Sequence, residues 1–175
     1  MAEQFEHLRR FIRDIPDWPK QGIIFRDITP LLADSEGFVS AVHALSRKFE
    51  GRGIEYVAAV EARGFIFGGA VAEHLGAGFI PIRKKGKLPW EHEAVSYELE
   101  YGTDTLEIHK DAIKAGAKVL LVDDLMATGG SMAASCKLIE RIGGEVAGIS
   151  FLIELSELKG RQQLGDYEVY TVLKY

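Results

Sequence analysis

The chain has 175 residues, of which 47% are hydrophobic, and its 21 Lys and Arg against 26 Asp and Glu give a net charge of −5. This length suits one domain over residues 1–175, with a sizeable core and a small appendage, and a second domain is not expected. The acidic balance excludes a general basic surface for nucleic acid, so any anion site must be local.

Other features of the composition bear on the cellular location. The single cysteine, Cys136, cannot form an intrachain disulfide, and packing is its expected role because its neighbours are apolar. The first residues contain no basic segment followed by an apolar one, so we expect no signal peptide. No apolar run approaches the ~20 residues that span a bilayer. We therefore expect a cytoplasmic protein without membrane or nucleic-acid partners.

The first half of the chain is predicted to alternate helices with strands. In order, hydrophobic spacing indicates an amphipathic helix (3–13), a short β-like piece (22–30), a second amphipathic helix (38–49), a core strand (54–60), a helix rich in Ala and Gly (67–74) and another strand (78–82). Pro16 and Pro19 end the first helix, and residues 34–36 supply capping groups for the second. Arg26 and Asp27 interrupt the β-like piece, as an exposed local ion pair would.

The second half begins with a basic stretch. Residues 83–87 hold four cations within five residues and show no periodicity, which suits either a solvated loop or a mobile lid that brings positive charge to an anion. The pattern then predicts the arms of a hairpin (95–99 and 103–109), a turn of helix (110–115), a buried strand (119–122), a helix (132–142), a strand (146–153), a short helix (155–164) and a last strand (167–173). Strands that alternate with helices predict a parallel sheet with right-handed crossovers.

The strand at 119–122 leads into two aspartates and a small-residue loop. Its four apolar residues run into Asp123 and Asp124, and then into Thr-Gly-Gly-Ser at 128–131. Open α/β folds bind ligands at this carboxyl edge, and N–H groups at a helix start can hold an anion. Adjacent aspartates repel each other unless a divalent ion or a sugar diol lies between them. Phosphate beside a sugar diol suggests a ribose 5-phosphate, and the alternative is an ordinary Gly-rich turn.

A second strand also ends in charge and glycine. Residues 54–60 run into Glu-Ala-Arg-Gly-Phe at 61–65. Arg63 could clamp an anion through paired hydrogen bonds, and a solvated arginine is the alternative. No Gly-x-x-x-x-Gly-Lys-Ser/Thr occurs, and the Gly-Ala-Gly at 76–78 runs into bulky residues instead of completing a dinucleotide fingerprint. A conventional kinase or dehydrogenase is therefore disfavoured.

Residues 119–131 resemble the phosphoribosyl-diphosphate-binding motif of the type I phosphoribosyltransferases, in which a hydrophobic strand leads into two acidic residues and a Thr-Gly loop. Further blocks are similar to the adenine phosphoribosyltransferase family, namely a base-binding hood (19–32), a pyrophosphate loop (61–65), a basic flexible loop (83–89) and the end of a catalytic loop (97–102). The blocks occur in the right order, which a chance match to one short motif would not give. The resemblance implies an α/β fold with a central, mainly parallel five-stranded sheet flanked by helices, an N-terminal hood within 1–33 and a flexible lid hairpin at 83–109.

The same resemblance implies an enzyme of purine salvage. It would transfer the 5-phosphoribosyl group from phosphoribosyl diphosphate to adenine, giving AMP and pyrophosphate, and it would act as a homodimer with Mg²⁺. Glu100 would be the acid/base residue near N7 of the purine, with Tyr101 beside it, and Arg63 would bind pyrophosphate. The metal would be held mainly by phosphoribosyl diphosphate, with no direct protein ligand expected.

Each position that matches the family pattern is implied to bind part of the substrates. Arg83, Lys84 and Lys87 would add positive charge around pyrophosphate. Phe25 and Leu125 would sandwich the purine, while the backbone of Ile24 and Arg26 reads its edge. Asp123 and Asp124 would contact the ribose hydroxyls, directly or through Mg²⁺ and water. The residues implied to hold the 5-phosphate are Ala127, Thr128, Gly129, Gly130 and Ser131.

Ala127 bears on which purine base the enzyme uses. Related enzymes for 6-oxopurines usually carry an Asp before Thr-Gly, so here the proton at N7 must be handled elsewhere, and Glu100 is the evident substitute. Met126 and Ser131 replace the more usual Leu and Thr, and both changes are conservative. A non-catalytic sensor of phosphoribosyl diphosphate and an enzyme for guanine, hypoxanthine or xanthine remain alternatives. The part of the chain after Glu145 matches loosely, and no chemistry is assigned to it.

Overall fold

The computed structural model describes residues 2–99 and 102–175, and a seven-stranded sheet forms its centre. The strand order is β5-β6-β4-β3-β7-β8-β9. In chain order the strands are β3 (Tyr56–Val60), β4 (Gly78–Lys84), β5 (His92–Leu99), β6 (Gly102–His109), β7 (Lys118–Met126), β8 (Glu145–Glu154) and β9 (Val169–Lys174).

Five neighbouring strands of this sheet, in the order β4-β3-β7-β8-β9, run parallel, which confirms the mainly parallel core. On one side β6 pairs with β4 in the antiparallel direction, and β5 pairs with β6 as the second arm of a hairpin. The hairpin was predicted from its alternating arms, but its place as an extension of the sheet was not. The central strand β7 continues through both aspartates to Met126, so these side chains lie on the strand itself.

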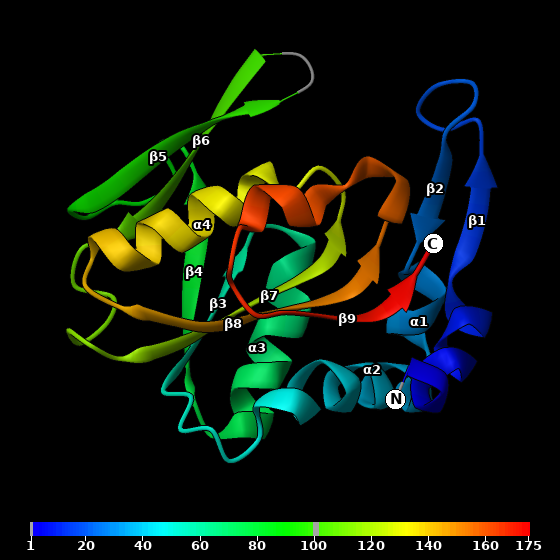
Figure 1. Ribbon diagram of the computed structural model, residues 1–175, viewed down its shortest axis with the longest axis horizontal. Coiled ribbons are helices and arrows are strands. Elements are labelled where there is room, and N and C mark those ends of the chain that lie inside the picture. The colour runs from blue at the N-terminus through cyan, green and yellow to red at the C-terminus, as the bar shows by residue number, and fades with distance from the viewer. Residues whose placement is uncertain (1, 100–101) are drawn as a thin grey trace.

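Side chains alternate across the sheet, so each face has its own hydrophobic core. On β7, Leu120 and Val122 pack under α2 (Ser35–Ser46) and α3 (Arg63–Leu75). Val119 and Leu121 belong to the core under α4 (Gly130–Arg141). Figure 1 shows α4 and α3 on opposite faces of the sheet. The chain is therefore a three-layer α/β fold, as predicted.

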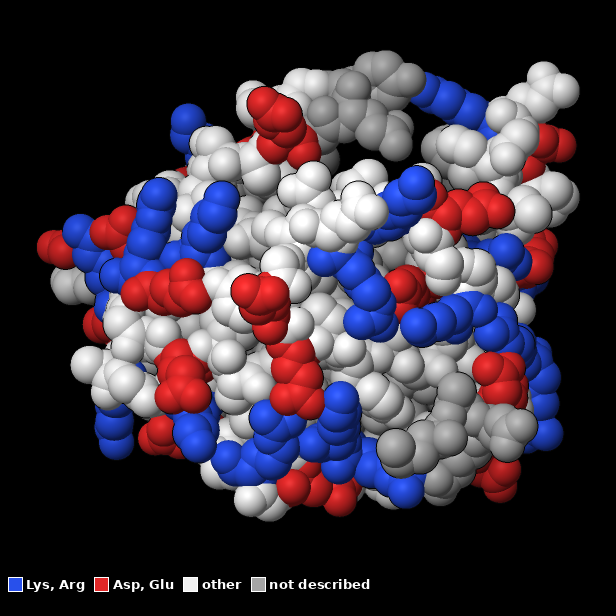
Figure 2. Space-filling model, viewed as in Figure 1, with Lys and Arg blue, Asp and Glu red and all other residues white. Residues whose placement is uncertain are grey.

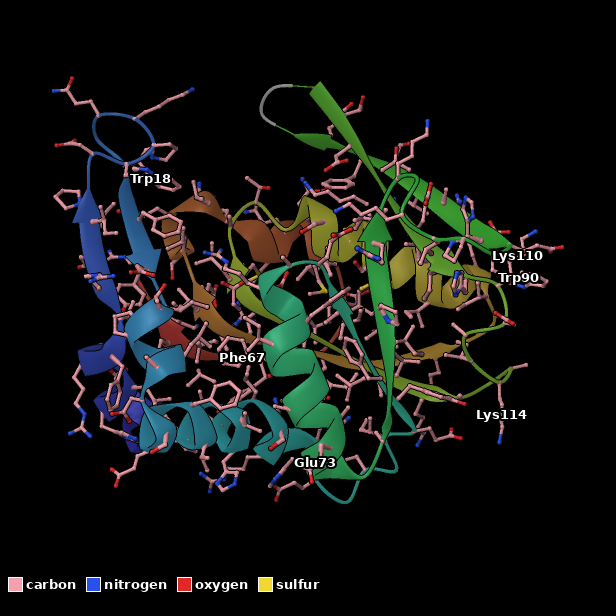
Figure 3. All side chains as sticks on the ribbon, turned by 180° about the vertical axis from the view of Figure 1, so that it is seen from behind. Trp18, Phe67, Glu73, Trp90, Lys110 and Lys114 are labelled. Carbon is pink, nitrogen blue, oxygen red and sulfur yellow. The ribbon has the colours of Figure 1, made fainter. Side chains whose placement is uncertain are left out.

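Helix α3 lies close to the sheet because its glycines leave room. A Cβ on Gly68 would lie 2.6 Å from the Cβ of Ala59 on β3, so no larger residue fits there. The neighbouring Phe67 is fully buried between α3 and α2, where its ring lies 5.8 Å from that of Phe38 (Figure 3). Burying one such side chain contributes about 1.5–3 kcal/mol to folding.

The N-terminal segment forms a separate two-stranded hairpin. Its elements are η1 (Ala2–Phe11), β1 (Arg13–Pro16), β2 (Ile24–Asp27) and α1 (Thr29–Ala33). Arg13 and Asp27 pair across the strands at 2.6 Å, and Arg26 pairs with Asp14. Arg26 and Asp27 thus do not form a local pair with each other, because neighbours on a strand point to opposite faces.

Three helix predictions differ from the structure. The first helix is a 3₁₀ helix that ends at Phe11, before β1. Residues 110–115 form turns and bends instead of a helical turn, with separate hydrogen bonds from the Ala112 N–H to His109 O and from the Ala117 N–H to Lys114 O. The helix predicted at 155–164 is divided into η3 (Ser156–Leu158) and η4 (Gly160–Leu164), since Lys159 between them takes a left-handed φ of 53°.

Two features mark the ends of α2. Asp34 caps α2, accepting a hydrogen bond of 2.8 Å from the N–H of Gly37, as predicted. A short 3₁₀ turn, η2 (Arg47–Phe49), follows that helix.

Basic and acidic side chains are interspersed over the face drawn in Figure 2. Within the described part of the chain, no helix is both long and apolar enough to cross a membrane.

Candidate active site

The candidate site lies at the carboxyl edge of the parallel strands, between two hairpins. Figure 1 shows the β1–β2 hairpin, which we call the hood, on one side of this edge and the β5–β6 hairpin on the other. Glu61 directly follows β3, and the loop at 127–131, which we call the phosphate loop, directly follows β7. The fold therefore gathers blocks that are far apart in the sequence at one edge.

Asp123 and Asp124 form a coupled acidic pair. The Asp124 side chain is only 7% exposed, and Arg63 Nε lies 2.9 Å from its Oδ2. Asp123 Oδ1 accepts the N–H of Asp124 at 2.9 Å. Burial and the charge of Asp124 raise the pKa of Asp123 well above its usual value. Burial also raises the pKa of Asp124, although Arg63 opposes that shift.

The Arg63 guanidinium thus pairs with Asp124, and its positive charge also acts on the neighbouring Asp123. Gly64 leaves room for the Asp123 carboxyl group, because a Cβ at this position would lie 2.8 Å from Asp123 Oδ1. Sugar hydroxyls or a cation would relieve the mutual repulsion of the carboxylates. The diol or metal chemistry expected of this pair stays a prediction.

Arg63 links the acidic pair to the hood. Its guanidinium carbon lies 5.5 Å from the ring centre of Phe25 on β2. The Phe25 ring is in turn held edge-on by Trp18, with 4.5 Å between the ring centres. The Trp18 side chain lies near the tip of the hood (Figure 3). Phe25 and Leu125 are both half-buried, as the two faces of a base site would be before a base binds.

Two other hood residues that were predicted to read the purine edge lie beside Phe25 on β2. Ile24 is exposed, and the Arg26 guanidinium carbon lies 4.1 Å from the ring centre of Tyr175. Arg26 also pairs with Asp14, so its side chain is engaged within the protein. A role through the backbone, as the resemblance implies, does not conflict with these side-chain contacts.

The phosphate loop ends at the start of α4. Gly129 has a φ of 84°, which favours glycine, and no side chain caps the helix. The first N–H groups of a helix have no partner within the helix, so they are available to an anion. Thr128 is exposed and Ser131 half-buried, and both side chains carry a hydroxyl donor. The loop thus offers N–H and hydroxyl donors to an anion, and its role as a phosphate cradle stays a prediction.

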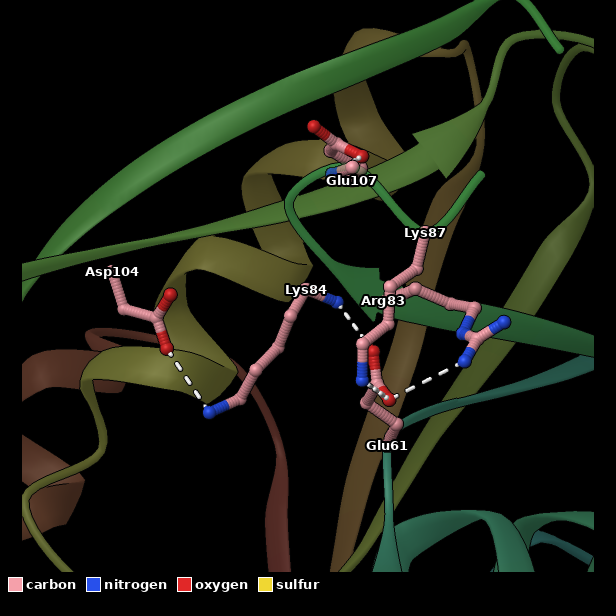
Figure 4. Close-up of polar contacts among 7 residues, drawn as sticks. Glu61, Arg83, Lys84, Lys87, Asp104 and Glu107 are labelled. Atoms are coloured by element: carbon pink, nitrogen blue, oxygen red, sulfur yellow. Dashed lines mark hydrogen bonds and ion pairs between the residues drawn. The ribbon is translucent and has the colours of Figure 1, made fainter. Parts of the chain in front are cut away.

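The basic loop folds back onto Glu61 (Figure 4). Glu61 Oε2 accepts from Lys87 Nζ at 2.6 Å and lies 3.4 Å from Arg83 Nη2, and its Oε1 accepts the N–H of Lys84 at 2.7 Å. Lys84 Nζ pairs instead with Asp104 at 3.4 Å. Burial opposes the ionised form, yet the contacts with Lys87, Lys84 and Arg83 together lower the pKa of Glu61 to about 2. The side chains of Lys84 and Lys87 are thus paired within the protein and at the same time about half exposed, at 54% and 48%.

Glu100 and Tyr101 lie outside the described residues. The strand that leads to them, β5, runs beside the phosphate loop, since a Cβ on Gly130 would lie 3.3 Å from Tyr97 Cδ2 and 3.4 Å from Glu98 O. Burial raises the pKa of Tyr97 to about 12, and its hydroxyl donates to Asp104 at 3.4 Å. Between β5 and α4 lies a cavity of about 380 Å³, lined in part by Tyr97, Thr128 and Gln163.

One neighbour of the phosphate loop was missed in the sequence. Gly160, at the start of η4, is buried against Ala127 and Gly129. Its only sequence signal was a glycine inside a segment predicted to be helical, which is unfavourable without a special reason. The C-terminal part, to which the sequence assigned no chemistry, therefore packs directly against the phosphate loop.

Magnesium fits the site only together with a ligand. Asp123 and Asp124 offer carboxylate oxygens, which Mg²⁺ prefers. Among the residues that the structure describes, however, no three His, Cys, Asp or Glu side chains gather as metal ligands. Water or substrate oxygens would therefore supply the remaining ligands beside these carboxylates.

Comparison with known proteins defines the class. The family model described as "Phosphoribosyl transferase domain" matches residues 32–174. Its match spans the whole parallel sheet, the acidic pair and the phosphate loop. The chain therefore belongs to the phosphoribosyltransferase family.

Individual relatives narrow the class further. The chain is 55% identical over 167 residues to the adenine phosphoribosyltransferase of Halothermothrix orenii, covering 95% of this chain and 98% of the relative. It is 56% identical over 168 residues to that of Clostridium perfringens, covering 96% and 98%. The crystal structure of adenine phosphoribosyltransferase from Thermoanaerobacter pseudethanolicus superposes with a TM-score of 0.94 at 51% identity, over 98% of this chain and 99% of that one.

A yeast structure is similar as well and bears on the ligand. The adenine phosphoribosyltransferase of Saccharomyces cerevisiae, complexed with an imino-altritol bisphosphate and adenine, has a TM-score of 0.93 at 40% identity and covers 99% of this chain and 100% of that one. Within the family, then, this chain is a transferase of the adenine phosphoribosyltransferase group.

Proposed function

We propose that this chain transfers the 5-phosphoribosyl group from phosphoribosyl diphosphate to adenine, giving AMP and pyrophosphate. One observation carries the proposal above all: Arg63 lies between the Phe25 ring of the hood and Asp124 of the acidic pair, at 5.5 and 2.9 Å. A base held at Phe25 would thus be adjacent to a sugar held at Asp124. The adenine named in the yeast complex supports the choice of base.

The donor is proposed to bind along the carboxyl edge of the sheet. Its 5-phosphate lies on the N–H groups and hydroxyls of the phosphate loop, and Asp123 and Asp124 bind its ribose hydroxyls. Its pyrophosphate lies between Arg63 and the basic loop of Arg83, Lys84 and Lys87. There it takes the place of Glu61 as the partner of Arg83, of Lys87 and of the Lys84 N–H. Phe25 and Leu125 enclose the purine, and the backbone of Ile24 and Arg26 binds its edge.

The residues provide mainly electrostatic catalysis. Breaking the bond from C1 to pyrophosphate builds positive charge on the ribose and negative charge on the leaving group. Arg63, Arg83 and Lys87 stabilise the leaving group, and Asp123 and Asp124 face the sugar. Glu100 takes the proton from the purine near N7, and Tyr101 is its proposed catalytic neighbour. Bound Mg²⁺ would neutralise the diphosphate, with Asp123 and Asp124 holding it through water.

The hairpin and the hood also exclude water, which would otherwise compete with adenine for the sugar cation. Ala127 supports adenine over the 6-oxopurines, because it provides no carboxylate at the loop and leaves the proton to Glu100. All of these parts belong to one domain, with residues 1–33 forming the hood region and 83–109 the lid.

A homodimer in the cytoplasm completes the proposal. Two large exposed apolar side chains lie on neighbouring elements, Ile66 on α3 and Phe79 on β4. The Phe79 ring packs edge-on against Phe65, with 5.5 Å between the ring centres. A second copy would remove this surface from water. Sedimentation that shows only monomer at micromolar concentration would contradict the dimer.

The direct test is product formation. The purified protein is incubated with adenine, phosphoribosyl diphosphate and Mg²⁺, and AMP is separated from adenine by ion-pair chromatography. We expect AMP and pyrophosphate in equal amounts. Tight Mg²⁺-dependent binding of the donor without AMP would instead favour a non-catalytic sensor.

A further inference from the structure

The C-terminal segment after β8 lies directly behind the phosphate loop. A Cβ on Gly129 would lie 2.4 Å from Gly160 O, and a Cβ on Gly160 would lie 2.3 Å from Ala127 O. Real Cβ atoms do not come so close to a backbone oxygen, so both positions require glycine. Gly129 needs it also for its φ of 84°, whereas the requirement at Gly160 is set by space alone. The two backbones therefore interlock.

Arg161, the next residue, fastens this segment to two strands. Its Nε and Nη2 donate to the two oxygens of Glu154 at the end of β8, both at 2.8 Å. Nη1 donates to Val169 O at 3.0 Å, and Nη2 also donates to Thr171 Oγ1 at 2.7 Å, both on β9. Paired charge-assisted bonds of this kind fix orientation as well as distance. The rigid sheet thereby sets the position of Gly160.

The other end of the segment is fixed to β7. Leu155 N–H donates to Met126 O at 3.0 Å, directly before the phosphate loop, and Leu164 is buried at the end of η4. The phosphate loop has few contacts of its own that could define its shape, because Ala127, Gly129 and Gly130 have little or no side chain. Its conformation must therefore be supported from behind.

We propose that Arg161 is a positioning residue for the reaction: with Glu154 it holds Gly160 against Ala127 and Gly129, and so orients the N–H groups that receive the 5-phosphate. The inference rests on the proposed function, since it takes the phosphate loop as the 5-phosphate site. Arg161 acts through the loop and not on the pyrophosphate or the base. Its loss therefore weakens ligands that carry a ribose 5-phosphate and leaves free pyrophosphate and adenine unaffected.

Four variants test this chain of contacts. Gly160→Ala inserts a Cβ against Ala127 O, and Arg161→Met removes all four hydrogen bonds. Arg161→Lys keeps the charge without the paired geometry. Thr171→Val removes one bond and leaves the Glu154 pair intact, so it is informative even if Arg161→Met does not fold.

Two control variants match these changes away from the loop. Gly69→Ala adds a Cβ in α3 where no atom lies within 4 Å. Glu168→Gln weakens a comparable ion-pair group with Lys48 and Arg52, both at 2.9 Å, beside the start of β9.

Binding is measured by calorimetry with ribose 5-phosphate and, separately, with pyrophosphate, and the KM values are measured for the donor and for adenine. We expect Gly160→Ala and Arg161→Met to weaken ribose 5-phosphate about 10- to 100-fold, as small displacements of positioned groups do. Arg161→Lys should restore part of the affinity, and Thr171→Val should lose about 2- to 5-fold. The KM for the donor should rise in parallel, while the pyrophosphate affinity and the adenine KM stay within about twofold of wild type.

The proposal is overturned if Gly160→Ala and Thr171→Val bind ribose 5-phosphate as tightly as the controls do, or if pyrophosphate affinity falls equally. It is also overturned, together with the loop assignment, if the wild type does not bind ribose 5-phosphate. A wild type that binds this ligand but forms no AMP contradicts the proposed function alone, and the binding constants of the variants still decide the role of Arg161.

Discussion

The two ends of the proposed donor site treat charge in opposite ways. At the ribose end, the adjacent carboxyls of Asp123 and Asp124 have one nearby guanidinium, that of Arg63. The pKa of both carboxyls is raised, by burial above all. At the pyrophosphate end, Glu61 alone meets Lys87, Arg83 and the Lys84 N–H, and its pKa is lowered to about 2. The two carboxyls at the ribose end thus have a single cationic partner, whereas the one carboxylate at the pyrophosphate end has several hydrogen-bond donors.

This difference shows which contacts a substrate adds and which it replaces. A sugar or a metal ion would satisfy an acidic pair that the protein leaves strained, so binding there adds new contacts. A pyrophosphate would have to displace Glu61 from cations that are already paired, so binding there is an exchange. The ribose end should therefore provide net affinity, and the pyrophosphate end should provide a switch of partners.

The largest effect should come from a residue that belongs to neither end. Glu100→Gln removes the proposed proton acceptor, and we expect kcat to fall about 10²- to 10⁴-fold, the usual contribution of a positioned acid or base. Donor affinity should change little, because charge at both ends is intact. Steady-state kinetics with calorimetry of the donor separates the two quantities. Glu93→Gln is the control, and equal kinetics in both variants would contradict the role of Glu100.

Arg63→Ala should have the next largest effect, because this residue contacts both the acidic pair and the hood. We expect kcat/KM to fall about 10²- to 10³-fold, as when one donor to the developing charge is lost. Pyrophosphate affinity should fall as well, and the melting temperature should drop because Asp124 loses its cation. Arg63→Lys should recover only part of the kcat/KM and of the pyrophosphate affinity, since one ammonium group cannot replace the planar guanidinium. Wild-type kinetics in Arg63→Ala would refute the assignment.

Arg63 and the acidic pair are parts of the candidate site that the sequence could locate. Asp123, Asp124 and Arg63 each follow or end a strongly apolar strand, so the parallel topology alone brings them to one edge. Predicted strands of this kind were confirmed because their hydrophobic runs are buried on both faces. The Asp34 cap was predictable for a similar reason, since it depends on residues only three positions apart.

Contacts between distant segments could not be read in the same way. The pairing of Glu61 with Lys87, and of Gly129 with Gly160, depends on how loops close in space and leaves no periodic pattern. The division of residues 155–164 at Lys159 follows from the same packing, because Gly160 must reach Ala127. Local patterns thus located the chemical groups, and tertiary contacts decided which groups are already engaged.

Glu61→Gln tests the exchange at the pyrophosphate end. Without the carboxylate, Lys87 and Arg83 no longer have a competing anion, so pyrophosphate should bind about 2- to 5-fold more tightly, as for loss of one partly exposed ion pair. Because the pKa of Glu61 is lowered, its stabilising pairing is present above the usual glutamate pKa and is lost as pH falls toward about 2. The difference from wild type should therefore be constant between about pH 5 and 8.

Calorimetric titration with pyrophosphate measures this effect, and Glu91→Gln is the control for loss of one nearby acidic charge. Weaker pyrophosphate binding in Glu61→Gln would show that Glu61 assists the ligand and does not compete with it.

Asp123→Asn tests the unfavourable burial of the charged acidic pair at the ribose end. Its effect on stability should be the smallest of the effects predicted. The raised pKa of Asp123 means that the wild type loses stability as pH rises from the usual carboxyl pKa through the raised one. The amide does not ionise, so the variant should be about 1 kcal/mol more stable at neutral pH without ligand. The gain corresponds to a melting temperature about 2–4 °C higher and should vanish near pH 4. AMP should stabilise the variant less than the wild type, and a variant that melts below wild type at every pH would contradict the strain.

The choice of base can be measured most directly by competition. Equal concentrations of adenine, guanine, hypoxanthine and xanthine are supplied with limiting phosphoribosyl diphosphate and Mg²⁺, and the nucleotides formed are separated and quantified. A site that binds the exocyclic amine through hydrogen bonds and has Ala127 at the loop should favour adenine about 10⁴-fold, so AMP should be the only nucleotide detected. Comparable amounts of a 6-oxopurine nucleotide, or no nucleotide at all, would contradict the account.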